Sequence, residues 1–274
     1  MSGQRALSHI PARPLRDFFR PPRGERGVSV TGVDLFEVIL VMAVFLGAIV
    51  QGFSGFAFSA VAGAILLQVQ APGLAIPLLM ICSLMIQTFV LVRLRAALSF
   101  KGSLPYLAGG IGGVLLAVLV FDRIDPHAFR QLFGGFLMIY AVSTVLRPQS
   151  ALLAMKVRPV GHTAIGFAGG LVGGLTAMPG AVIAIWCDAH AMPKVAQRAV
   201  VQPFIAAMQS LALVFLFLKA PGAPAAALPH LPFVLPALLA GSTLGLFLFG
   251  KVSDIGFRRA ISVLLFASGV MLVA

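Results

Sequence analysis

Eight apolar stretches, separated by short polar segments, follow one another along the chain. A helix that crosses the hydrocarbon core of a bilayer needs about 20 predominantly apolar residues. Most of the stretches have about that length, so the pattern predicts an all-α polytopic membrane protein with about eight transmembrane segments. The stretches cover residues 35–67, 74–94, 103–121, 129–146, 162–189, 197–219, 231–250 and 258–273.

The first and the fifth stretch are too long for one straight crossing and too short for two. Each contains a glycine-rich break, Gln51-Gly-Phe-Ser-Gly-Phe-Ala-Phe-Ser59 in the first and Gly169-Gly-Leu-Val-Gly-Gly-Leu-Thr-Ala-Met-Pro-Gly180 in the fifth. A glycine in a helix interior costs about 1 kcal/mol relative to alanine. In lipid, an interrupted helix is tolerated where it packs on protein or lines a wet cavity. We therefore predict two discontinuous helices whose breaks mark a transport site.

The two halves of the chain resemble each other beyond their hydropathy. Pro105-Tyr-Leu-Ala-Gly-Gly110 parallels Pro236-Ala-Leu-Leu-Ala-Gly241, and Gln87 parallels Gln209. We expect two homologous four-segment repeats, each opening with a broken helix, with the site at their interface. If the broken segments cross the membrane, the repeats are parallel; if they return to their own side, each half has three crossings and the repeats are inverted. The sequence leaves this choice open.

Four regions follow from this pattern. Residues 1–30 contain six arginines and four prolines and predict a disordered cytoplasmic tail. The N-terminal repeat covers 31–148, a cytoplasmic linker 149–161, and the C-terminal repeat 162–274. With the tail inside and each broken segment crossing once, thirteen Lys and Arg fall inside and seven outside. The positive-inside rule therefore favours the single crossing and a cytoplasmic N-terminus.

Composition agrees with a membrane protein. The chain is 59% hydrophobic and 10% charged, whereas a soluble domain carries about 25% charged residues. The net charge of +12 comes from Lys and Arg that cluster between the apolar stretches. Topology and anionic lipid explain this charge, so we expect lipid and not nucleic acid as a partner. The two cysteines lie inside apolar stretches, which predicts packed thiols without a disulfide framework.

Three motifs resemble the TauE/SafE family, also called sulfite exporters. They are Gly52-Phe-Ser-Gly-Phe-Ala-Phe58, Pro77-Leu-Leu79 and Met192-Pro-Lys-Val-Ala-Gln-Arg198. The likeness covers roughly residues 35–273. It implies a multi-pass permease of the bacterial inner membrane that moves a small organic or inorganic anion, often sulfur-containing, such as sulfite or a sulfonate. A carboxylate without sulfur is the alternative substrate. The family implies no cofactor, and the chain has no Walker-type motif. The oligomeric state, a homo-oligomer included, stays open.

The candidate substrate-binding residues are polar or glycine positions at the two breaks and on two neighbouring stretches. Half-helix N-termini present unpaired N–H groups and a positive dipole end, which suits an oxyanion. The alternative for the glycines is close helix packing, and for the proline a kink without a ligand. The set is Gln51, Gly52, Ser54 and Gly55 at the first break, Gly173, Gly174, Thr176 and Pro179 at the second, Ser83 and Gln87 on the second stretch, and Arg198, Gln202 and Gln209 on the sixth.

Arg198, Gln202 and Gln209 fall on one stripe of the sixth predicted helix. At 100° per residue they lie within about 40° of one another. A polar stripe that ends in an arginine is typical of an anion lining. The alternative is an interhelical hydrogen-bond seam, with Arg198 reaching to the membrane interface. Ser83 and Gln87 are the first-half counterpart and share both interpretations.

The positions of the acidic residues along the chain differ from those in many proton-coupled carriers. None of the eight Asp and Glu residues lies in the middle of an ordinary span, where such carriers usually keep one. Asp188 and His190, which end the fifth stretch, are the candidates for a proton relay, with interfacial solvation as the alternative. The coupling ion stays open, and no metal site is predicted.

One enzymatic alternative comes from the first break. Gly52-x-Ser54-Gly55 also resembles the Gly-x-Ser-Gly motif of rhomboid intramembrane proteases. Such an enzyme needs a histidine on another span at a similar depth to activate Ser54. The histidines beyond the tail fall in loops or at segment ends. We therefore predict that the protein is not an enzyme and has no catalytic residues.

Overall fold

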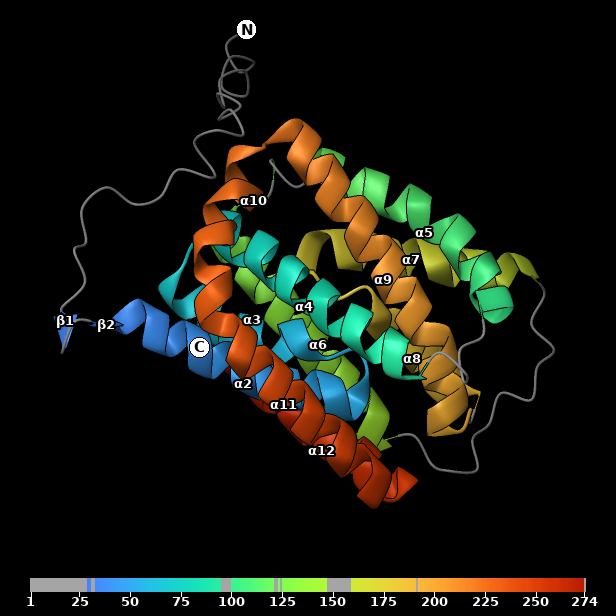
Figure 1. Ribbon diagram of the computed structural model, residues 1–274. Coiled ribbons are helices and arrows are strands. Elements are labelled where there is room, and N and C mark those ends of the chain that lie inside the picture. Colours follow the sequence, from blue (N-terminus) through green and yellow to red (C-terminus); the bar gives the residue numbers. More distant parts are fainter. Residues whose placement is uncertain are drawn as a thin grey trace, which may run out of the picture.

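The computed structural model is a helical protein, shown in Figure 1. It describes residues 29–30, 33–94, 100–120, 123, 125–146, 159–190 and 192–273. Two very short strands, β1 (Ser29–Val30) and β2 (Val33–Asp34), pair antiparallel immediately before the first long helix. The predicted tail and the predicted linker fall largely outside the described residues.

Helices cover all eight predicted apolar stretches. Both long stretches are divided at their glycine-rich breaks, which confirms the prediction of two discontinuous helices. A short helix and a 3-10 turn before the seventh stretch were not predicted. The elements are α2 (Leu35–Ser54), α3 (Phe58–Val69), α4 (Pro72–Leu94), α5 (Phe100–Val120), α6 (Pro126–Leu146), α7 (Pro159–Thr176), α8 (Gly180–Ala189), α9 (Lys194–Lys219), α10 (Gly222–Ala227), η3 (Leu228–His230), α11 (Leu231–Lys251) and α12 (Asp254–Val273).

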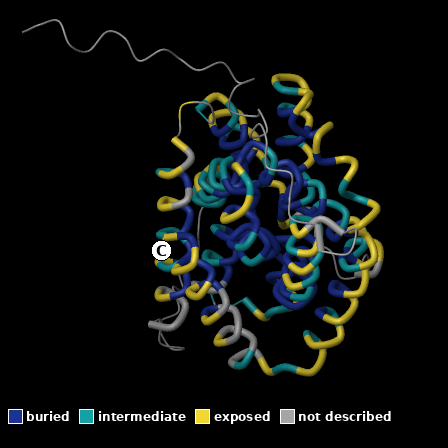
Figure 2. The backbone as a smooth tube through the Cα atoms, turned by 90° about the vertical axis from the view of Figure 1, so that its left-hand side faces the viewer, coloured by how far each residue is buried: buried dark blue, intermediate teal, exposed yellow. Residues whose placement is uncertain are grey.

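Large apolar side chains cover much of the outer surface. In the part of the chain that is described, five helical stretches are long and apolar enough to cross a membrane: Leu35–Ser54, Pro72–Val92, Gly102–Val120, Lys194–Lys219 and Gly222–Lys251. Figure 2 shows the exposed residues on the outward sides of the helices and the buried ones in the interior. Among the exposed side chains are Ile139 and Leu218, which are 71% and 74% accessible. In water such a surface would aggregate, so it fits a lipid-facing protein.

The first broken segment folds back on itself. In one straight helix, Gly47 and Ala62 would lie about 22 Å apart, because the rise is 1.5 Å per residue. Instead, a methyl group placed on Gly47 would lie 2.8 Å from the Ala62 Cβ atom. Helix α3 therefore runs back along α2. This geometry favours a segment that returns to its own side, and not the single crossing that the count of Lys and Arg favours.

Glycines set the closest helix contacts, and these join distant parts of the chain. On α11, Gly241 faces Phe45 and Gly245 faces Ile49, so α2 and α11 run parallel. Such approaches let backbones pack where apolar lipid supplies no hydrophobic force between helices. Gly52 belongs to the same contact, since a methyl group there would collide with the backbone of α11.

Two further helix pairs are built in the same way. Gly109 of α5 lies against Thr163 of α7, and Gly113 lies against Phe167, so these helices are also parallel. Gly134 of α6 lies against the last turn of α12, whereas Gly269 lies against Met138. Because the numbering runs in opposite directions along this last contact, α6 and α12 are antiparallel.

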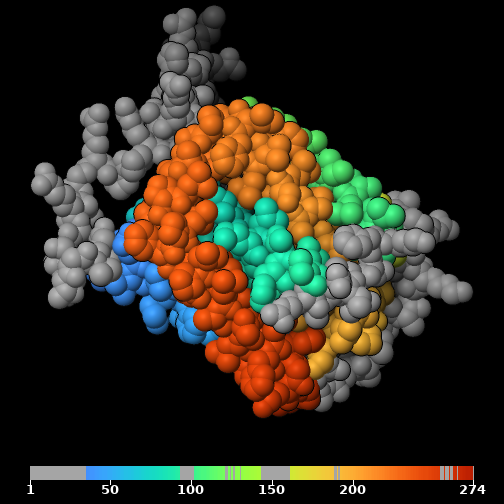
Figure 3. Space-filling view, in the orientation of Figure 1, coloured from blue at the N-terminus to red at the C-terminus, as the bar shows by residue number. Residues whose placement is uncertain are grey.

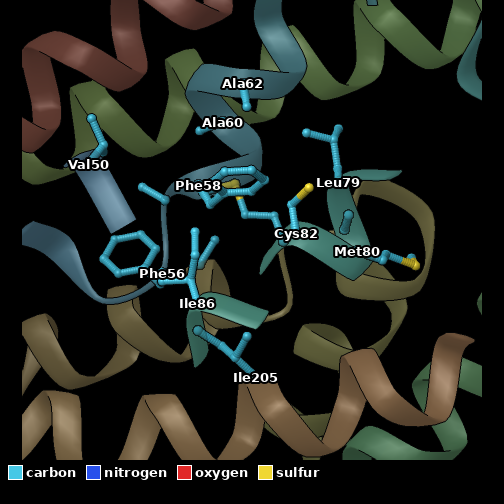
Figure 4. Close-up of a cluster of buried hydrophobic side chains, with 14 of the residues drawn as sticks. Val50, Phe56, Phe58, Ala60, Ala62, Leu79, Met80, Cys82, Ile86 and Ile205 are labelled. Carbon is cyan, nitrogen blue, oxygen red and sulfur yellow. The ribbon is translucent and has the colours of Figure 1, made fainter. Parts of the chain in front are cut away.

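Apolar packing surrounds the first break. Figure 4 shows Phe56 and Phe58, which follow the break, close to Cys82 and Ile86 of α4. Cys82 and Cys187 are both buried and not joined in a disulfide, as the sequence predicted. On one face of the molecule α4 reaches the surface between α9 and α11, as the teal patch between orange and red-orange in Figure 3 shows.

Candidate functional site

The first break is held by two of its own side chains. The Ser54 Oγ atom accepts hydrogen bonds from the backbone N–H groups of Phe56 and Ala57, at 3.2 and 3.1 Å. The Gln51 side chain accepts one from the Phe58 N–H at 3.0 Å and donates one to the Gly55 carbonyl at 3.4 Å. These bonds satisfy backbone N–H groups of the turn between α2 and α3 and of the first residue of α3. The described bonds of Gln51 and Ser54 are thus internal to the break, where we had predicted substrate contacts.

Gly55 is the turning point of this break. Its φ angle is +89°, in a region that side chains rarely adopt. A methyl group on Gly55 would lie 3.1 Å from Arg198 Nε and 3.4 Å from Gln202 Nε2, both on α9. The turn therefore brings bare backbone against two of the predicted polar side chains.

The second break is held by side chains from other helices. Ala177, the residue directly after α7, also has a positive φ angle, 57°. Its carbonyl accepts hydrogen bonds from the Ser59 hydroxyl at 2.7 Å and from Gln209 Nε2 at 3.1 Å. The Thr176 hydroxyl donates to Val172 of its own helix at 2.8 Å. Neither partner of the Ala177 carbonyl comes from α7 or α8.

The glycines and the proline of the second break serve close packing. Gly173 lies against the ring of Pro179, and a methyl group on Gly174 would lie 2.5 Å from the Cβ atom of Ala117 on α5. The described contacts of Gly173 and Gly174 are thus packing contacts, while substrate binding at Gly173, Gly174 and Pro179 stays a prediction.

The two breaks touch each other, although they are far apart in the sequence. Ser59 and Ala177, which share a hydrogen bond, are separated by 118 positions. A methyl group on Gly180 would lie 2.8 Å from Phe56 Cβ and 2.5 Å from the end of the Ile205 side chain. The breaks and the middle of α9 therefore form one buried junction.

Arg198 is buried at this junction. The side chain is 5% exposed. Its Nη2 atom donates to the carbonyls of Gly52 and Phe53, in the last turn of α2, at 2.5 and 3.0 Å. The guanidinium carbon lies 3.9 Å from the centroid of the Phe249 ring, a cation–π contact. Arg198 Nε and Nη1 have no hydrogen-bond partner.

Three buried glutamines near these elements also have unused hydrogen-bonding atoms. Both amide atoms of Gln87 and Gln202, and the Oε1 atom of Gln209, lack partners. All three side chains are at most 1% exposed. An unpaired buried polar group costs about 1–3 kcal/mol. Groups of this kind are normally satisfied by a bound polar ligand or by ordered water.

The remaining predicted residues are not linked to this junction by any described hydrogen bond. Ser83 is buried on α4. The Nδ1 atom of His190, the residue after α8, lies 2.8 Å from the Trp186 carbonyl, and the centroids of the two rings are 4.4 Å apart with the planes tilted by 45°. The side chain of Asp188 lies outside the described part, so the proton relay stays a prediction. Among the residues searched, no group of three potential metal ligands occurs.

Sequence reasoning missed Ser59, Lys194 and Phe249. Lys194, one turn before Arg198, donates to the carbonyls of Phe249 and Val252 at 3.3 and 2.7 Å and so caps α11. Its spacing of four from Arg198 was a usable signal, because residues four apart share a helix face. Ser59 lies in the first break's own motif, but its partner could not be found locally.

Comparison with known sequences decides the family. The sequence model of the sulfite exporter TauE/SafE family matches residues 39–272. The chain belongs to the TauE/SafE family. Membership makes it a membrane transporter of sulfite-type anions, and the match includes both breaks and Arg198. No match was found among curated proteins or among solved structures. The TauE/SafE assignment agrees with the apolar outer surface and with the resemblance noted in the sequence.

Proposed function

We propose that this TauE/SafE protein is a secondary transporter of a small sulfur-containing anion, sulfite or a sulfonate, and that the anion binds to Arg198 and Gln202 beside the first break. One observation carries the proposal. A buried guanidinium has two of its three nitrogen atoms without a hydrogen-bond partner. No carboxylate of the described residues pairs with it.

The chemistry of arginine supports an anionic ligand. A guanidinium stays protonated in proteins, and an uncompensated buried charge is strongly destabilising. A sulfur oxyanion would supply the missing charge and accept hydrogen bonds from Nε and Nη1, which are stronger than bonds between neutral groups. The Gln202 amide, which faces the same Gly55 backbone, would contribute a further donor.

The transport mechanism we propose uses two repeats of inverted orientation. Corresponding helix ends support the repeats: Ser54 and Thr176, Phe58 and Gly180, and Pro72 and Lys194 are each 122 residues apart. The helix contacts correspond as well, since α2 packs on α11 just as α7 packs on α5. The antiparallel contact of α6 with α12 supports inversion, because parallel repeats would make these two helices parallel.

If the two repeats exchanged conformations, the junction would open first to one side of the membrane and then to the other, which is alternating access. The junction of the breaks lies where the repeats meet, and Arg198 of the second repeat bonds to α2 of the first. Small rotations of one repeat against the other would change which end of the junction is open. Both the inner-membrane location and the cytoplasmic N-terminus belong to this proposal.

A carboxylate is the second candidate substrate, because a guanidinium also binds carboxylates well. The protease alternative has less support. The Ser54 oxygen accepts two backbone hydrogen bonds, and within the described residues no histidine is recorded as its partner.

Uptake into proteoliposomes tests the proposed function. Labelled sulfite, taurine, sulfoacetate and acetate would be offered with and without an imposed pH gradient, to wild type and to Arg198→Gln. Removing one partner of a buried charged contact typically costs 2–5 kcal/mol, so we expect uptake of the transported anion to fall about 100-fold. Lys251→Gln, an exposed change in the last turn of α11, is the matched control and should transport normally. Unchanged uptake in Arg198→Gln would contradict the assigned site.

A further inference from the structure

We infer that the site selects a singly charged sulfur oxyanion that carries its own hydrogen-bond donor, the chemistry shared by hydrogensulfite and hydroxyalkyl sulfonates, over the doubly charged sulfite or sulfate ion. This inference rests on the proposed function, since it concerns the ligand of the same site. Two independent features lead to it, the charge of the site and its unused acceptors.

The charge of the site is that of one guanidinium. Among the residues whose burial is described, Arg198 is the buried charged side chain. Lys194 lies one turn away, but its ammonium group is already bonded to two carbonyls at the end of α11. A monoanion would neutralise Arg198. A dianion would leave one net negative charge in a buried place, which is unfavourable because buried charge without a counter-charge is poorly solvated.

The unused acceptors favour a ligand that donates. Gln87, Gln202 and Gln209 each have a buried carbonyl-type Oε1 atom without a donor. For Gln87 and Gln202 the conclusion is the same if the amide is turned over, because neither amide atom has a partner. Sulfite and sulfate dianions have no hydrogen atom to give. They would satisfy Arg198 and leave the oxygen of Gln202 unpaired.

A protonated monoanion would satisfy both groups at once. Arg198 Nε and Gln202 Nε2 lie 3.1 and 3.4 Å from the same point, the position of a methyl group on Gly55. A ligand that contacts one can therefore reach the other. Its anionic oxygens would accept from Arg198, and its O–H group would donate to the amide of Gln202.

Competition against labelled sulfite uptake by the full-length protein in proteoliposomes tests this inference. The competitors are ethanesulfonate, 2-hydroxyethanesulfonate, ethane-1,2-disulfonate and sulfate, which separate charge from the presence of a donor. We expect 2-hydroxyethanesulfonate to compete about tenfold better than ethanesulfonate, the effect of one hydrogen bond. The two dianions should be at least about 100-fold weaker, because of the uncompensated charge.

A pH series distinguishes the two sources of this chemistry. Sulfite loses its second proton near neutral pH, whereas the sulfonate group of 2-hydroxyethanesulfonate does not titrate there. At constant total sulfite, uptake should fall from mildly acidic to mildly alkaline pH in step with the hydrogensulfite fraction. Uptake of 2-hydroxyethanesulfonate should stay constant over the same range. Sulfite uptake that follows the dianion fraction would overturn the inference.

Gln202→Leu sharpens the test. In this variant the advantage of 2-hydroxyethanesulfonate over ethanesulfonate should disappear, whereas both should still exceed the dianions. The wild-type series decides the inference even where the variant fails to fold. Saturable sulfite uptake that sulfate inhibits as well as 2-hydroxyethanesulfonate does would overturn the inference and leave the proposed function standing. Absence of saturable uptake of every sulfur anion would overturn the proposed function itself.

Discussion

The two breaks solve the same problem with different partners. In each break, the residue directly after the preceding helix has a positive φ angle. This residue is Gly55 after α2 and Ala177 after α7. At the first break, Gln51 and Ser54 of the same segment accept hydrogen bonds from the backbone N–H groups, and Arg198 of α9 donates to the carbonyls of Gly52 and Phe53. At the second break, the Ala177 carbonyl depends on Ser59 and Gln209 from other helices.

The conformations of the two breaks therefore depend on different contacts. The turn of the first break, from Gly55 to Phe58, is held by hydrogen bonds within its own segment, so it should depend less on changes in other helices. The second is specified by tertiary contacts and should respond to changes in α3 and α9. In the transport mechanism that we propose, the second break would respond to movement of the first half, because Ser59 of α3 bonds to its Ala177 carbonyl.

Gly55→Ala should give the largest effect. The left-handed conformation costs a non-glycine residue about 1–2 kcal/mol, and the new methyl group would press on Arg198 Nε at 3.1 Å. We expect lower thermal stability and a loss of uptake of at least about tenfold. Unfolding can be followed with a thiol-reactive dye, since Cys82 and Cys187 are buried.

Gly135→Ala is the control for this change. Gly135 lies inside helix α6, and nothing is found within 4 Å of a methyl group placed on it. Alanine should be neutral or slightly stabilising there. If both variants behaved alike, the tight turn at Gly55 would not be what limits the first break.

Removing both partners of the Ala177 carbonyl should have the next largest effect. Ser59→Ala and Gln209→Leu should each reduce stability by about 1 kcal/mol, since the carbonyl keeps one bond. The double variant should lose more than the sum, because a buried acceptor without any partner costs about 1–3 kcal/mol. A double-mutant cycle in detergent measures the coupling. Strict additivity would show that the two bonds do not support one carbonyl.

Ser54→Ala should cost about 1 kcal/mol, because the backbone N–H groups of Phe56 and Ala57 lose their acceptor. Ser54→Thr keeps the hydroxyl and should lose much less. Thermal unfolding of the two variants measures the difference. Equal losses would mean that the bonds to Phe56 and Ala57 add nothing to the stability of the first break.

Ala177→Gly should give the smallest effect, and one of opposite sign to Gly55→Ala. Glycine removes the cost of the positive φ angle at this position, but it loses more entropy on folding. The result should lie between no change and about 1 kcal/mol of added stability. A clear destabilisation would show that the Ala177 methyl group packs favourably enough to outweigh its strain.

Local sequence was enough to find the helices and the breaks. Hydropathy and the cost of glycine in helices placed both interruptions, because these are properties of short segments. The stripe of Arg198, Gln202 and Gln209 followed from helical periodicity, and the structure buries all three side chains. These predictions needed no knowledge of how the segments pack.

The partners of these elements could not be predicted in this way. Gln51 and Ser54 were assigned to the substrate because their polarity was visible, whereas their bonds depend on the path of the turn at Gly55. The contact of Ser59 with Ala177 depends on α3 folding back along α2. Neither event leaves a pattern in the local sequence. The same holds for Gly52, whose neighbour on α11 is set by tertiary packing.

The parallel contact of α2 with α11 has a consequence for biogenesis. α2 leaves the ribosome well before α11, which carries the glycine surface that receives it at Gly241 and Gly245. During insertion α2 therefore lies in the bilayer without its contact to α11 until α11 has been synthesised. A chain released before α11 would contain both breaks and Arg198, yet leave α2 without the helix on which it packs. Membrane quality control would recognise the unpaired α2 helix in such a product. We therefore expect fragments that lack α11 to be degraded unless α11 is supplied as a separate polypeptide.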